Sequence, residues 1–247
     1  MTETTLVTFL LDRSGSMSSC RESTIEAFNG YVESLRSAPV SFTFLQFDSD
    51  SLDKVHFEKP IKDVPDLTLK TYAPRGGTPL IEAATKTIQA LDTALKAKTE
   101  KPKVVVCIQT DGEENQSGPE YSWKALKDLI EAKTAEGWQF NFMGAGIDAY
   151  DQGSKMGISA AATMSYDSTD KVATRAAFAA SGSNTAMFAA GLCATTDYSS
   201  LQKMASGDRF DPSLKLKKPT PTIRPSPKGS LDLTSGGKPT RGLDLTQ

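Results

Sequence analysis

Histidine and cysteine are scarce in this 247-residue sequence, and their scarcity argues against two kinds of site. His56 is the only histidine, and a lone imidazole cannot build a zinc site, so we expect it on the surface or at a strand edge. Three cysteines, an odd and widely separated set, argue against a disulfide framework. They are Cys20, Cys107 and Cys193. This pattern is typical of a reducing compartment, so we expect a cytoplasmic protein in which Cys20 and Cys107 are buried.

Long apolar runs are also missing. No basic N-terminus precedes an extended apolar stretch, so no signal peptide is expected, and no run is long enough to span a membrane. The net charge is only −2, and the length fits one α/β domain with an appendage. A domain of this size buries most of its surface without disulfides or other crosslinks.

A carboxylate and two hydroxyls follow the first apolar segment of the chain. Asp12, Ser14 and Ser16 stand two residues apart, directly after a stretch over 4–11 that is typical of a buried strand. Ligands of open α/β sheets bind at the carboxyl ends of the strands, where this loop would lie. Oxygen ligands suit a hard cation such as Mg²⁺ better than zinc. Taken alone, the segment would be better explained as a turn that caps the next helix.

Two further oxygen donors follow other predicted elements. Thr78 is expected at the N-cap and Pro79 at the first position of a helix, in the tight loop 75–79. Asp111 follows the continuous apolar run 103–110, which has the character of a buried strand. Because neighbouring strand ends meet at one edge of a doubly wound sheet, five residues are predicted to surround one metal ion. They are Asp12, Ser14, Ser16, Thr78 and Asp111.

With these residues the sequence resembles the von Willebrand factor A (vWA) family. Asp12-x-Ser14-x-Ser16, Thr78 and Asp111 match its metal-ion-dependent adhesion site (MIDAS) without a substitution. The likeness covers roughly residues 3–195, including the strand and glycine turn Phe140–Gly146 and a helical stretch near 172–180. It is strongest to small, stand-alone intracellular members from bacteria and their phages.

The resemblance implies a Mg²⁺ or Mn²⁺ ion and a role for each ligand. The three hydroxyls, from Ser14, Ser16 and Thr78, would touch the ion, and Asp12 and Asp111 would act mostly through water. An ion held by neutral oxygens stays electron-poor, which favours one carboxylate from outside. The expected partner is therefore a protein that donates Asp or Glu as the last ligand.

The whole chain predicts a doubly wound, mainly parallel α/β sheet with one antiparallel edge strand, a Rossmann-like arrangement. The strand over 138–145 is expected to close the parallel set. Parallel strands are expected at 4–11, 41–47, 103–110 and 138–145, with the antiparallel edge at 54–57. Helices are expected at 20–37, 79–97, 122–136 and 150–156.

These features favour a divalent-metal-dependent protein–protein binding module over an enzyme. A metal-dependent hydrolase would need a general base, and a phosphotransferase would usually carry a second carboxylate where Ser14 stands. The loop 75–78 lacks the length and the lysine of a phosphate-binding loop. Glu113 and Glu114 could tune the charge of the site, but as loop carboxylates close to Asp111 they are expected to be exposed and solvated. The alternative suggested by the family is an adaptor or accessory subunit of an AAA-type ATPase.

Residues 211–247 are expected to form a flexible, proline-rich, basic tail after a vWA domain at 1–210. Segment 213–247 has five prolines, no aromatic residue, seven basic and two acidic residues, and therefore a net charge of +5. Such a segment cannot bury enough apolar area to offset its conformational entropy. A modest charge without aromatic stacking groups argues against specific nucleic-acid binding.

The tail contains the phrase Leu-Asp-Leu-Thr twice, at Leu231–Thr234 and Leu243–Thr246. Chance repetition in a low-complexity segment is one explanation. A duplicated docking peptide, whose two weak sites gain avidity from their tether, is another. A third is self-association through the tail, in which an aspartate of a repeat serves as the acidic ligand of a metal site in the same or a neighbouring chain.

Overall fold

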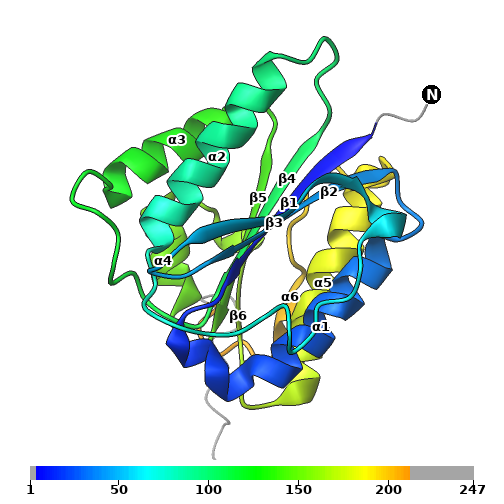
Figure 1. The fold of residues 1–247 in the computed structure, drawn as a ribbon. Coiled ribbons are helices and arrows are strands. Elements are labelled where there is room, and N and C mark those ends of the chain that lie inside the picture. The colour runs from blue at the N-terminus through cyan, green and yellow to red at the C-terminus, as the bar shows by residue number, and fades with distance from the viewer. Residues whose placement is uncertain (1–3, 212–247) are drawn as a thin grey trace, which may run out of the picture. The chain divides into compact units, whose positions relative to one another are not determined.

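The protein, described from a computed structural model over residues 4–211, is an α/β sheet with helices on both faces (Figure 1). The strands are β1 (Thr5–Asp12), β2 (Val40–Phe47), β3 (Leu52–Pro60), β4 (Val104–Thr110), β5 (Gln139–Ala145) and β6 (Thr163–Tyr166). The helices are α1 (Arg21–Leu35), α2 (Leu80–Lys96), α3 (Trp123–Ala135), α4 (Ala149–Met156), α5 (Lys171–Ala189) and α6 (Ser200–Ala205). α5 contains the helical stretch that the family resemblance implied.

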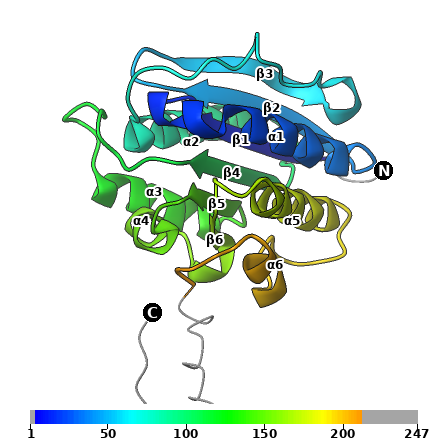
Figure 2. The same cartoon turned by 90° about the horizontal axis from the view of Figure 1, so that it is seen from below.

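The strand order is β3-β2-β1-β4-β5-β6, which Figure 2 shows from one edge to the other. All neighbours pair in parallel except β2 and β3, which are antiparallel. The predicted fold class and antiparallel edge strand are therefore confirmed. The chain leaves β1 toward one edge and returns to β4 on the other side, so the order reverses between these two strands. In open α/β sheets, ligands bind at such a switch point.

The prediction that 138–145 closes the parallel set is wrong, because β6 lies beyond β5. β6 has only four residues, too few to show a periodic pattern in the sequence. Its outer edge is covered by the chain after α6. There the Ser165 N–H donates to Asp208 Oδ2 at 3.0 Å, and the Asp167 N–H donates to the Ser206 carbonyl at 3.1 Å.

Each face of the sheet has its own apolar core. Val7, Phe9 and Leu11 pack with α1 and α5 on one face, whereas Leu6 and Leu10 pack with α2, α3 and α4 on the other. All five side chains are at most 1% exposed. β1 is buried on both faces, which is why its sequence is a continuous apolar run without alternation.

The expected positions of the scarce residues are confirmed. Cys20 and Cys107 are buried, and no disulfide involves the three cysteines. His56 lies on the edge strand β3. No helix within residues 4–211 is long and apolar enough to cross a membrane. The predicted tail from residue 212 onward, with its two repeats, lies outside the described residues.

Phe9→Ala should destabilise the domain by about 3–5 kcal/mol, because it removes a buried ring and leaves a cavity. The Phe9 ring contacts Phe28, Tyr31 and Phe178, with centroid distances of 5.2, 4.8 and 5.9 Å. The matched control is Phe57→Ala, since Phe57 is 49% exposed. Urea unfolding would compare the two, and equal losses of stability would contradict this assignment of the core.

Candidate metal centre

Asp12 is the last residue of β1, and its carboxylate is fully buried. Oδ1 accepts a hydrogen bond from the Ser14 N–H at 2.6 Å, and Oδ2 accepts one from the Thr110 hydroxyl. The Asp12 carbonyl accepts from the Tyr72 hydroxyl at 2.6 Å. These bonds fix the carboxylate at the switch point between β1 and β4.

Ser14, Ser16 and Asp111 form a chain of hydrogen bonds from the β1 loop to the β4 loop. Ser14 Oγ and Ser16 Oγ lie 3.0 Å apart, and the Ser16 hydroxyl donates to Asp111 Oδ1 at 2.6 Å. Ser14 precedes a 3₁₀ turn over Gly15–Cys20, and its hydroxyl makes no capping bond there. The structure therefore brings together the residues that the sequence predicted after strands 4–11 and 103–110.

Thr78 reaches the same place from the loop before α2. A Cβ atom built on Gly112 would stand 3.0 Å from Thr78 Oγ1 and 3.7 Å from Ser16 Oγ, so both hydroxyls lie close to Gly112. Because Gly112 has no side chain, no Cβ crowds these two oxygens. The Thr78 side chain is buried, and its backbone exchanges two hydrogen bonds with Asn115, at 2.9 and 3.1 Å.

The donor set fits a hard divalent cation. The pKa of Asp12 is raised to about 6, mainly by burial and to a smaller extent by the nearby Asp111, against the opposing hydrogen bonds from Thr110 and Ser14. Burial also raises the pKa of Asp111. A cation between these two carboxylates would relieve both effects. Within residues 4–211, no group of three or more His, Cys, Asp or Glu side chains is placed to hold a metal ion.

The prediction that Thr78 caps the following helix is wrong. α2 begins at Leu80, and the residue at its N-cap position is Pro79, which makes no side-chain capping bond. The first free N–H groups of α2 donate instead to the loop after β4: Ile81 to Glu114 Oε2 at 2.8 Å and Glu82 to Ser117 Oγ at 2.9 Å.

The expectation for Glu114 is also wrong, whereas Glu113 is exposed as expected. Glu114 is partly buried and accepts four hydrogen bonds. They come from the Ile81, Gln116 and Ser117 N–H groups and from the Ser117 hydroxyl, at 2.6–2.8 Å. Nothing in the sequence near Glu114 indicates this role, because the helix that it caps begins more than thirty residues earlier.

Asp48, in the turn after β2, is a second carboxylate whose role the sequence did not predict. Its buried Oδ2 accepts from Arg13 Nε at 2.6 Å and from Arg75 Nε at 3.0 Å. Its Oδ1 accepts from the N–H groups of Asp50 and Ser51. Asp48 therefore joins the β1 loop, the turn after β2 and the loop before Thr78.

Backbone bonds complete the connection between these loops. The Gly15 N–H donates to the Gly76 carbonyl at 3.0 Å, and the Gly77 N–H donates to Ser49 Oγ at 3.0 Å. Gly76 has a φ of +64°, and a Cβ there would stand 2.3 Å from Ser49 Oγ. The tight turn before Thr78 therefore requires glycine at this position.

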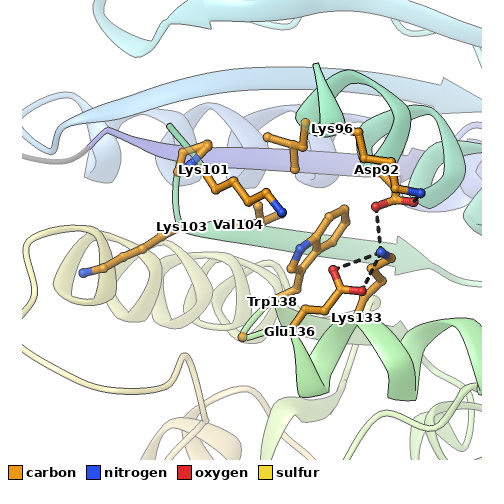
Figure 3. Close-up of a pocket in the computed structure, with 11 residues that line it drawn as sticks. Asp92, Lys96, Lys101, Lys103, Val104, Lys133, Glu136 and Trp138 are labelled. Carbon is orange, nitrogen blue, oxygen red and sulfur yellow. Dashed lines mark hydrogen bonds and ion pairs between the residues drawn. The ribbon is translucent and has the colours of Figure 1, made fainter. Parts of the chain in front are cut away.

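A cavity of about 640 Å³ lies at the other end of the sheet, next to Trp138 and the C-terminal ends of α2 and α3 (Figure 3). Its most buried charge, Lys133, bonds to Asp92 at 2.6 Å and to Glu136 at 2.9 and 3.0 Å. Lysines commonly stabilise the carbonyl groups at helix C-termini. This cavity contains none of the predicted ligands, so its size does not identify it as the metal centre.

The strand order, the helices on both faces and the loops at the switch point define a vWA-type fold. It is similar to the vWF domain of the type V pili tip protein Mfa5 from Porphyromonas gingivalis, with a TM-score of 0.52 and 9% identity over 76% of this chain and 95% of that one. It is also similar to the pilus adhesin SpaC from Lactobacillus rhamnosus GG, with a TM-score of 0.52 and 14% identity over 76% of this chain and 30% of that one.

A third similar structure is proximal thread matrix protein 1 from the mussel byssus, with a TM-score of 0.50 and 14% identity. One structure of that protein is described as having a zinc-occupied MIDAS motif. This chain spans about half the length of the mussel protein, 46% of it, and these low identities establish the fold alone. Neither a protein-family model nor a curated protein sequence matches the chain.

Asp48→Asn should destabilise the domain by about 3 kcal/mol, because an amide carries no charge and has only one acceptor oxygen. It cannot serve both the guanidinium groups of Arg13 and Arg75 and the N–H groups bound to the other carboxylate oxygen. Asp50→Asn is the matched control. The Asp50 side chain is 63% exposed and lies 3.5 Å from Arg75, so its loss should change stability by less than about 0.5 kcal/mol. Unfolding in urea without metal would measure both variants. Equal stability of the two would remove Asp48 from this role.

Proposed function

We propose that this chain is a Mg²⁺- or Mn²⁺-dependent protein-binding module whose metal accepts an Asp or Glu from a partner protein. The observation that supports this most is the hydroxyl of Thr78, which lies beside Gly112, as the hydroxyl of Ser16 does, and which caps no helix. Together with the hydroxyl of Ser14 and the carboxylates of Asp12 and Asp111, it gives an all-oxygen site at the switch point. A bound ion would supply an exposed positive charge there.

The proposed ligands are accessible from outside on one side only. Asp12, Ser14 and Thr78 are at most 2% exposed, whereas Ser16 is exposed and Asp111 is partly exposed. A partner would therefore approach past Ser16 and Asp111. The carboxylates of Asp12 and Asp111 would repel an acidic partner residue in the absence of metal, and the cation would reverse this effect.

A non-enzymatic role fits the hydrogen bonding of the nearby carboxylates. Both oxygens of Asp12 accept hydrogen bonds from the loops, and Glu114 accepts from α2 and from its own loop, so both carboxylates have a structural role in the fold. An adaptor role toward an AAA-type ATPase, a cytoplasmic location, a bacterial or phage origin and self-association through the tail stay predictions from the sequence.

Ser14→Ala should abolish Mn²⁺ binding while leaving the metal-free fold intact, since the Ser14 hydroxyl makes no capping bond. In the native protein, Mn²⁺ at a hundredfold excess over the dissociation constant should stabilise the fold by about 2.7 kcal/mol. For a domain of this size that raises the melting temperature by about 5–10 °C. The control is Ser18→Ala, because Ser18 is exposed on the same turn. Calorimetry and melting with and without EDTA test this, and identical curves for native protein in both conditions would contradict it.

Partner binding should require the ion, because the partner carboxylate gains its affinity from the exposed charge. A partner captured in Mg²⁺ should be released by EDTA and should bind the Ser18→Ala variant but not the Ser14→Ala variant. The loss should lie mainly in the off-rate, as for a buried charge contact. A partner that binds equally well in EDTA would show that another surface of the domain is used.

A further inference from the structure

The N-terminus of α2 has a local sequence that favours a different start from the one observed. Thr78 followed by Pro79 is a typical pair for the N-cap and first helical positions. A threonine N-cap commonly accepts a hydrogen bond from the N–H group three residues later, which here belongs to Ile81. In the structure the helix begins later, at Leu80, and Pro79 has a ψ of 62°, outside the helical range.

Glu114 occupies the place that the Thr78 hydroxyl would otherwise take. The Ile81 N–H donates to Glu114 Oε2 at 2.8 Å, so this donor is already satisfied. The other carboxylate oxygen, Oε1, is held by the N–H groups of Gln116 and Ser117, both at 2.8 Å. Glu114 is thus fixed by its own loop and bonds to α2 as an external cap.

The Thr78 hydroxyl cannot cap α2 and face the metal loops at once, because the two roles require different conformations of Thr78 and Pro79. In the structure Thr78 Oγ1 and Ser16 Oγ both lie within 4 Å of the point where a Cβ of Gly112 would stand. An N-cap role would direct the same oxygen toward the first turn of α2. The two roles therefore compete for one hydroxyl.

We propose that Glu114 is a positioning residue that keeps Thr78 available to the metal ion by capping α2 in its place. The inference rests on the proposed metal site, but the competition for the Ile81 N–H exists in the metal-free protein as well. Loss of Glu114 would let Thr78 cap the helix, which would preserve much of the fold while removing one metal ligand.

A double-mutant cycle tests this with Thr78→Val, which removes the hydroxyl but keeps the branched shape, and Glu114→Ala. In the metal-free native background, Thr78→Val should change the melting temperature little, because the hydroxyl caps nothing. In the Glu114→Ala background, Thr78→Val should lower the melting temperature by about 2–4 °C more, which is the effect of losing a helix N-cap. Equal shifts in both backgrounds would overturn the proposal.

The second measurement is Mn²⁺ affinity by calorimetry. Glu114→Ala should weaken it by about tenfold or more, as for other residues that orient metal ligands, whereas the control Glu113→Ala should bind like the native protein. Native-like affinity in Glu114→Ala would also overturn the proposal. If Glu114→Ala does not fold, Glu114→Gln replaces it in both measurements, since an amide keeps the size but cannot accept all four bonds.

The two measurements separate this inference from the proposed function. If the native protein and Glu113→Ala bind no Mn²⁺, the metal site itself is wrong, and the melting cycle alone decides whether Glu114 and Thr78 compete for the cap. If both bind Mn²⁺ and the melting shifts are additive, the metal site stands and the role of Glu114 is refuted.

Discussion

The parallel pairing of β1 with β4 is the constraint on which the candidate site depends. The register aligns Leu11 with Gln109, so Asp12 is level with Thr110, and Asp111 follows one residue later at the same edge of the sheet. Two carboxylates would repel one another there, and burial makes their charge more costly. The surrounding hydroxyls and N–H groups reduce that cost. A cation would remove most of it, which is a physical reason to expect one.

The elements that the sequence predicted well are those whose own residues show a hydrophobic pattern typical of a strand or a helix. β1 and β4 are continuous apolar runs because both faces of the sheet are covered, and α2 shows a clear helical period. The five predicted ligands come from three loops that the fold brings together, because each follows or precedes such an element. Their closeness follows from topology alone. Their role as ligands stays a prediction.

The parts that the sequence could not predict depend on contacts between distant segments. β6 is short and is defined by its pairing with β5 and by the chain that covers its outer edge. Asp48 is one acidic residue in a polar turn, and only the folded chain places Arg13 and Arg75 against it. Glu114 caps a helix from another loop. No local pattern could identify any of these three features.

The error at Thr78 is informative because local preference and tertiary structure disagree at that residue. Natural sequences are mostly consistent between these levels, and exceptions concentrate where function requires them. A helix that began at Pro79, with Thr78 as its cap, would satisfy the local sequence and draw the hydroxyl toward the first turn of α2. The fold instead uses Glu114 and Ser117 for the capping bonds. The hydroxyl is left beside Gly112, where it caps no helix but suits a cation.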